Sequence, residues 1–309
     1  LAMTGRIQVD SFKGAGVDLT KLDMPITMNG GFLRLIYADK PTGQNLAPPA
    51  GFNGGTLNLA GTQIDLRSPT PTLTTVGNLA LLDNAELNPV FTAWSLGTIL
   101  ANPIFVGADK ATGYLNVRLV ECRDLPLSSN LQTGDATIDI SIKQLTIVNQ
   151  LIEKLGDVAH FDKESIRGDV PHWRSVIHGG IVDQDFTLTV GQNQRPLKLN
   201  GKVRLIDLQM MPLTIDLPWK LFGIKGVPSS VANVLPEGVP IPLTGTVNNP
   251  QVSFDFNKVV QDSAGKNLGN LVPGILGNKD GATTQPADSD PLKSLGDLID
   301  QATKKKKKK

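Results

Sequence analysis

The stretch that decides the fold runs from residue 181 to residue 205 and reads IVDQDFTLTVGQNQRPLKLNGKVRL. Apolar residues alternate with polar ones from Phe186 to Val190, and the alternation resumes from Leu197 to Leu205. Successive side chains on a β-strand point to opposite faces, so each segment has one apolar and one polar face. This pattern predicts antiparallel sheet with one side in water.

The same period of two recurs along most of the chain. Further segments with it are Ile7–Val9, Leu57–Leu59, Ile64–Leu66, Leu115–Leu119, Ile138–Ile142, Leu213–Leu217 and Val252–Phe256. The 31 glycines and 21 prolines are enough to form the turns that connect many short strands. We predict a mainly β protein of roughly ten to fourteen strands.

Three segments break this rhythm and predict short helices. Asn88 followed by Pro89 is a cap signal, and the helix after it carries Trp94, Ile99 and Leu100. A second helix is predicted at 144–159, with Leu145, Val148, Leu151, Ile152 and Leu155 on one face. A third is predicted at about 256–272.

The composition predicts three parts to the chain. Residues 1–277 form the β-domain, 278–291 a disordered linker, and 292–309 a short amphipathic stretch that ends in six lysines. The chain begins at Leu1 without a methionine or a charged leader. We therefore expect a C-terminal piece of a longer protein, whose signal peptide or anchor lies outside this chain.

The net charge of +1 combines two opposite parts. Lys304–Lys309 account for six of the 30 basic residues, so the rest carries 24 basic against 29 acidic residues, a net charge of −5. Aromatic residues are 5% of the chain, and a single-strand nucleic-acid platform needs aromatics beside basic residues. We expect no nucleic-acid partner.

Chemistry-bearing motifs are sparse. His172 and His178 lie six apart, and zinc motifs, nucleophile elbows and phosphate loops are absent from the sequence. Cys122 has Arg123 beside it, which would lower its pKa, but its place at a strand end favours an inert thiol. The segment 183–185, Asp-Gln-Asp, is interpreted as a tight turn. We expect no metal, no cofactor and no enzymatic activity.

Several segments together resemble the AsmA-like family, TamB-like relatives included. Residues 239–256 read VPIPLTGTVNNPQVSFDF, a strand, Gly-Thr, Asn-Pro and a strand ending in Asp, and resemble the family's C-terminal signature. Similar layered strands occur at 4–12 with 16–19, 28–35, 179–186 and 197–205. The resemblance covers roughly residues 4–260.

The resemblance implies a long curved antiparallel sheet, a trough, groove or half-barrel, with two or three short helices capping it. It also implies a periplasmic protein, anchored to the inner membrane by an N-terminal segment that this chain lacks. Family members are implicated in moving phospholipid between membranes and in outer-membrane integrity. The lysine-ended tail is not a family hallmark.

On this basis the chain is expected to be a non-enzymatic envelope protein that binds or conducts phospholipid through an apolar groove. Each CH₂ of a lipid tail buried there contributes about 0.8 kcal/mol. The candidate lining residues, taken from the alternating rows, are Ile138, Ile140, Ile142, Phe186, Leu188, Val190, Leu197, Leu199, Val203, Leu205, Leu213, Ile215 and Leu217. The helix at 144–159 would cap or cross the open face.

Two other readings stay open. In one, the same rows form the dry core of a β-sandwich, and exposed strand edges pair with an envelope partner protein. In the other, the protein is a β-rich glycan hydrolase, although no carboxylate pair in the sequence points to it. Lys304–Lys309 would either contact an anionic membrane surface or serve as a solubilising end.

Overall fold

The computed structural model describes residues 2–35, 49–75, 77–127, 134–159, 166–190, 195–218 and 238–252. All of these belong to one of the two compact units into which the chain divides, the one formed by Leu1–Gly226 and Glu237–Phe254. The predicted linker, lysine tail and third helix lie outside the described residues.

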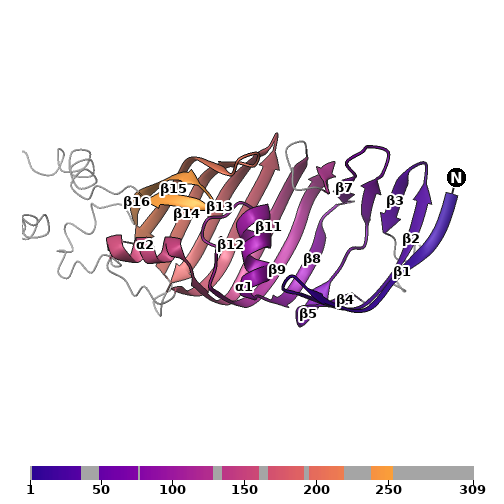
Figure 1. Ribbon diagram of the computed structural model, residues 1–309, viewed down its shortest axis with the longest axis horizontal. Helices are drawn as coiled ribbons and strands as arrows, with labels where there is room; N and C mark the ends of the chain where they lie inside the picture. The colour runs from indigo at the N-terminus through magenta and orange to yellow at the C-terminus, as the bar shows by residue number, and fades with distance from the viewer. Residues whose placement is uncertain are drawn as a thin grey trace, which may run out of the picture. The chain divides into compact units, whose positions relative to one another are not determined.

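The described residues form one open antiparallel sheet of 17 strands (Figure 1), which confirms the predicted fold class. In the N-terminal part the strands are β1 (Ala2–Gly14), β2 (Val17–Asn29), β3 (Phe32–Leu35), β4 (Ala50–Phe52), β5 (Gly55–Leu57), β6 (Thr62–Asp65), β7 (Thr72–Thr75) and β8 (Leu79–Glu86). In the C-terminal part they are β9 (Lys110–Arg123), β10 (Leu125–Pro126), β11 (Asp135–Val148), β12 (Ile166–His178), β13 (Ile181–Val190), β14 (Arg195–Arg204), β15 (Gln209–Pro218), β16 (Gly238–Thr246) and β17 (Asn249–Val252). Short strands such as β4, β5 and β10 bring the number above the predicted range.

The sheet forks at β2. The first part of β2 pairs with β4, and from there the ladder runs through β5, β8, β9 and β11. The last part of β2 pairs with β3, which leads through β6 and β7 to β10. From β11 to β17 each strand pairs with the next, as expected for successive hairpins.

The first predicted helix is present as α1 (Pro89–Thr92) continued by a π-helix, η1 (Ala93–Ile99). The side-chain Oδ1 of Asn88 accepts a hydrogen bond from the Phe91 N–H at 3.0 Å, and Pro89 occupies the first turn. Both parts of the cap signal in the sequence therefore act as predicted.

The second predicted helix is wrong in its first third. The structure has strand β11 up to Val148, and α2 covers only Gln150–Ala159. Leu145 and Ile147 alternate into the apolar face of the sheet and pair with β12 and β9, so the ladder continues to the end of β11. Asn149 then starts the helix, because its Oδ1 accepts from the Ile152 N–H at 2.9 Å.

The predicted turn at Asp183–Asp185 is also wrong, since both residues lie inside β13. The turn before β13 is formed by Gly179 and Gly180, with φ of 55° and 76°, which glycine adopts at no steric cost. On the strand, the Asp183 carboxylate lies 3.4 Å from the Lys202 ammonium.

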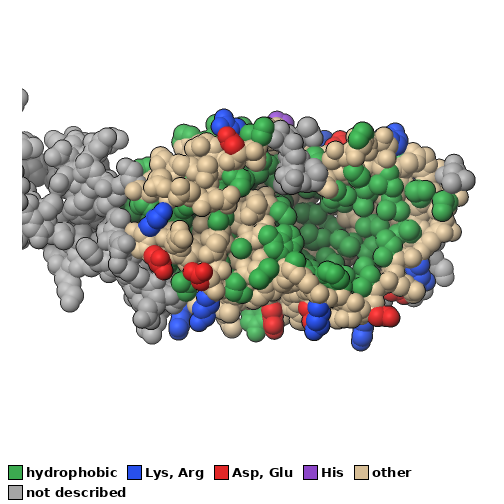
Figure 2. Space-filling view, viewed as in Figure 1, with side chains coloured by type: hydrophobic (Ala, Val, Ile, Leu, Met, Phe, Trp, Pro, Cys, Tyr) green, Lys and Arg blue, Asp and Glu red, His purple; other side chains and the backbone are tan. Residues whose placement is uncertain are grey.

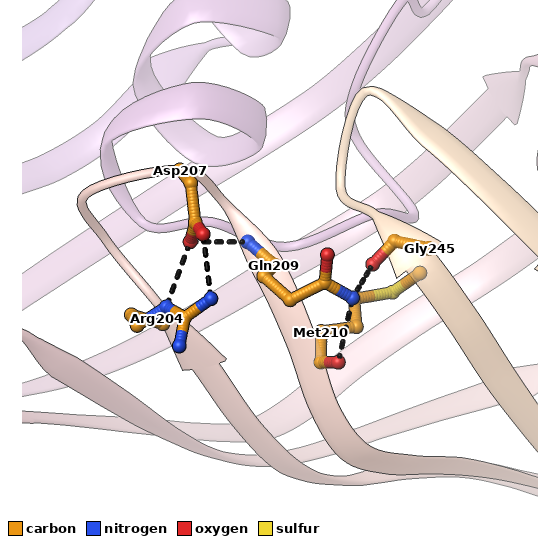
Figure 3. A network of polar contacts seen from close by, with 5 residues as sticks. All are labelled: Arg204, Asp207, Gln209, Met210 and Gly245. Carbon is orange, nitrogen blue, oxygen red and sulfur yellow. Dashed lines mark hydrogen bonds and ion pairs between the residues drawn. The ribbon is translucent and has the colours of Figure 1, made fainter.

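The turn between β14 and β15 is fixed by side-chain hydrogen bonds (Figure 3). The Arg204 guanidinium donates to both carboxylate oxygens of Asp207, and the Gln209 N–H donates to Asp207 Oδ1 at 3.1 Å. The Gln209 side chain then donates to the Gly245 carbonyl at 2.7 Å, which ties this turn to the one between β16 and β17. These bonds link the ends of β14, β15 and β16.

Candidate functional site

One apolar row runs unbroken across eight strands of the sheet. In an antiparallel ladder, directly paired residues lie on the same face. The paired residues are Leu82, Val117, Ile140, Trp173, Phe186, Leu199, Ile215 and Ile241, and every one of them is buried. We call the sheet face that carries this row the inner face. Figure 1 shows α1 and α2 on one and the same side of the sheet.

Over β12 and β13 the inner face is covered by the segment 100–108, which follows η1. The Phe105 ring stacks on Trp173 with centroids 5.3 Å apart and meets Phe186 edge-on at 5.9 Å. All three side chains are fully buried. We call the part of the inner face on β11–β13, with segment 100–108, the covered region.

Two buried amides hold this cover in place. The Asn149 side chain donates to the Ile104 carbonyl at 2.6 Å, and the Gln184 side chain donates to the Leu100 carbonyl at 2.5 Å. Gln184 in turn accepts from the Trp173 indole N–H at 2.7 Å. These bonds satisfy the amides of Asn149 and Gln184 and the Trp173 indole, while the amide nitrogen of Asn102 and the hydroxyl of Ser175 are buried here without a partner among the described residues. The full burial of its aromatic side chains shows that the covered region is packed as a core.

The structure places twelve of the thirteen predicted lining residues on strands β11 and β13–β15, and the thirteenth, Leu205, in the turn between β14 and β15. Eleven of them are buried, and Val190 and Leu205 are half-buried. Ile140, Phe186, Leu199 and Ile215 lie together in the row across the sheet. The role of the thirteen residues as lipid contacts stays a prediction, and five of the buried ones lie in the covered region, namely Ile138, Ile140, Ile142, Phe186 and Leu188.

A second set of apolar rows lies on β1–β3, β6 and β7, which we call the open region. One row pairs Met28, Leu33, Ile64 and Leu73, and all four are only half-buried. On the edge strand β1, Met3 is 51% exposed and Ile7 38%. Within the part of the chain that the structure describes, no helix packs on these side chains.

The open region is visible as a hollow in the molecular surface. Figure 2 shows this hollow beyond α1, over the N-terminal strands, with a floor of hydrophobic side chains. It lies on the same side of the sheet as the helices. Contiguous apolar surface of this kind marks a place where a ligand, a membrane or a partner binds.

The opposite face of the open region is polar and carries ion pairs. Arg6 on β1 donates to the carboxylate of Asp23 on β2, which lowers the pKa of Asp23. Hydrogen bonds from Arg67 hold the pKa of Asp65 at about 2. These pairs show that one face of these strands is in contact with water, whereas the other face carries the apolar rows.

The sequence did carry a signal for the open region. Leu22, Met24, Ile26 and Met28 alternate through β2, but Pro25 interrupts the strand propensity of the segment. Pro25 pairs with Arg6, so it lies on the polar face and leaves the apolar row intact. Reading the alternation through the proline would have added these residues to the candidate lining.

The remaining chemistry-bearing residues do not form a catalytic constellation in the described part of the chain. Cys122 is buried, and its pKa is raised to about 11 by burial and by Asp124, so Arg123 does not activate it. His172 and His178 lie on the surface, near Asp185 and Asp135 respectively. Among the described residues, no three His, Cys, Asp or Glu side chains are placed to hold a metal ion.

The helices in the described ranges are too short or too polar for any of them to cross a membrane. Comparison with known proteins finds no matching family model, no matching curated protein and no matching solved structure.

Proposed function

We propose that this chain is a non-enzymatic protein that binds phospholipid through the open region of its sheet. The observation that supports this is the hydrophobic hollow in Figure 2, over strands on which the row Met28, Leu33, Ile64 and Leu73 stays half-exposed while the aromatic side chains of the covered region are fully buried. An acyl chain in the hollow would remove apolar surface from water on both partners, at about 25 cal/mol per Å².

The geometry fits a long apolar ligand better than a compact one. The row Met28, Leu33, Ile64 and Leu73 crosses four strands, and neighbouring strands lie about 4.8 Å apart. A row of that length matches an extended hydrocarbon chain. Binding of this kind needs neither a nucleophile nor a shifted pKa.

The wider setting of the proposal comes from the resemblance to AsmA-like proteins. It would place the chain in the periplasm, anchored to the inner membrane by a segment beyond this chain, and give it a role in outer-membrane lipid homeostasis. The predicted contact of Lys304–Lys309 with an anionic membrane is part of the same proposal.

The test is to purify the protein and quantify co-purifying phospholipid by mass spectrometry. Ile64→Asp places a charge on the apolar face of β6, and we expect it to lower bound lipid at least tenfold. The matched control is Gln63→Asp, one residue earlier on the polar face, where Gln63 already accepts from Arg34 at 3.0 Å. Equal lipid content in both variants, or none in the unaltered protein, would contradict the proposal.

The second candidate is a structural or assembly module of the envelope. It is favoured by the close packing of the covered region and by β1, a 13-residue strand that is exposed almost throughout. Exposed edge strands can pair with a strand of a partner. A protein free of lipid whose β1 becomes protected from hydrogen exchange when an envelope partner is added would support it.

A further inference from the structure

The helix formed by α1 and η1 is apolar on its outward side as well as its inward side. Phe91 and Leu96 are buried, whereas Val90 is 56%, Trp94 38% and Ile99 43% exposed. A surface helix ordinarily turns a charged or polar face to water, and one that is apolar all round is normally covered on both sides.

The helix and its flanks also carry no charge. From Leu87 to Ala108 there is no Asp, Glu, Lys or Arg, in a chain of which 19% is charged. A face built to stay in water, or to recognise a protein through ion pairs, would carry such residues.

The polar side chains at Trp94, Ser95 and Thr98 on this helix are satisfied internally, whereas the hydroxyl of the buried Thr92 has no partner among the described residues. The Trp94 indole N–H donates to the Ala15 carbonyl at 2.9 Å. The hydroxyls of Ser95 and Thr98 donate to carbonyls of their own helix, those of Phe91 and Ala93. In an apolar medium every donor needs such a partner, because no water is present to replace it. A hydrogen-bonding protein partner would instead find few free groups here.

The helix is held rigidly from behind. Asn88 caps it and also donates to the Gly16 carbonyl, which ties it to the β1–β2 turn. Gly97 lies flush against segment 100–108, since a Cβ there would stand 2.9 Å from the backbone of Val106. A surface fixed in advance loses little conformational entropy when it binds.

We infer that Val90, Trp94 and Ile99 form a docking site for the surface of a phospholipid bilayer. The helix is too short to span a bilayer, so it would insert shallowly at the boundary between headgroups and acyl chains, where tryptophan is favoured. This inference rests on the proposed function, because the hollow beside α1 in Figure 2 would then open next to the lipid it binds.

The experiment measures partitioning of the full chain onto vesicles of neutral phosphatidylcholine at high salt, which removes any contribution of the lysine tail. We expect Val90→Asp and Ile99→Asp each to weaken partitioning about tenfold. The matched control is Ile206→Asp, because Ile206 is 66% exposed but lies between Arg204 and Asp207. The control should partition like the unaltered protein.

A second readout uses tryptophan emission. The unaltered protein should shift to the blue on binding vesicles, and Trp94→Phe should remove that shift while changing partitioning by less than about threefold, since the apolar ring is kept. Unchanged partitioning of Val90→Asp, or an equal loss in Ile206→Asp, would overturn the inference.

The lipid content of the same variants separates this inference from the proposed function. Helix variants that lose vesicle binding should still co-purify phospholipid, because the open region is intact. If the unaltered protein carries no lipid but binds vesicles through Val90 and Ile99, the docking site stands and the proposed function fails. If the unaltered protein carries lipid but substitutions at Val90 and Ile99 leave vesicle binding unchanged, the docking site is contradicted and the proposed function is not.

Discussion

The covered and the open regions are two parts of one sheet with the same alternating sequence pattern and different surroundings. In the covered region Trp173, Phe186 and Phe105 are fully buried, and buried amides fasten segment 100–108 over them. In the open region Met28 and Ile64 are only half-buried. The difference teaches that a period of two marks an apolar face but does not show whether protein or ligand covers it.

The largest expected effect is on stability and separates the two regions directly. Phe186→Ala removes a fully buried ring from the covered region and should lower the free energy of unfolding by about 3–5 kcal/mol. Met28→Ala, in the open region, should cost about 1 kcal/mol because its side chain is already half in water. Urea unfolding measures both, and equal losses would show that the open region is also a packed core.

A smaller effect is expected from the amide that fastens the cover. Asn149→Ala removes the cap of α2 and leaves the Ile104 carbonyl without its donor, so it should cost about 2–3 kcal/mol. Hydrogen exchange should quicken at the amides of Ile152 and Phe105. The comparison variant is Asn88→Ala at the half-exposed cap of α1, for which about 1 kcal/mol is expected. A reversed order would mean that the cover is not held by Asn149.

The smallest effect concerns two exposed ion pairs, Arg67–Asp65 on the polar face of the open region and Arg204–Asp207 at the turn between β14 and β15, which should behave alike. Arg67 lowers the pKa of Asp65 to about 2, and Arg204 lowers that of Asp207. A lowered carboxyl pKa stabilises the fold above the unfolded value of about 3.9 and stops doing so as the pH falls through the folded value. The contribution of these two carboxyls to the free energy of unfolding should therefore be constant from pH 7 to pH 5 and decrease below pH 4.

Carboxyl NMR titration of Arg67→Met and Arg204→Met checks the cause. Each substitution should raise the pKa of its own partner, Asp65 or Asp207, toward the ordinary value and leave the other in place. A pKa change of both carboxyls in one variant would contradict the view that the two ion pairs act independently.

Much of the fold could be predicted from local signals. The alternation at 186–190 and 197–205 corresponds to β13 and β14, and the signal Asn88-Pro89 corresponds to the start of α1. The helix boundary at 144–159 could not, because Leu145, Val148, Leu151 and Ile152 fit a helical stripe as well as a strand that runs into a helix. Residues 145–148 form a strand because they pair with β9 and β12.

The candidate site was harder to predict than the fold. The thirteen predicted lining residues were chosen because their alternation is clean, and clean alternation is also what a well-packed core strand requires. The open region could not be predicted in the same way, because several of its strands are short and Pro25 interrupts the alternation. The fork at β2 has no local sequence signal.

By itself the sequence determined the class of fold, the two-faced character of each strand and the scarcity of catalytic motifs, because these depend on side-chain type and spacing along the chain. Only the tertiary structure decided which half of the apolar face is filled. That choice depends on segment 100–108, which crosses back over β12 and β13 and is held there by long-range contacts such as Phe105 with Trp173 and Asn149 with Ile104. Packing between distant segments, which no window of the sequence contains, therefore closes one part of the face and leaves the other as a hollow.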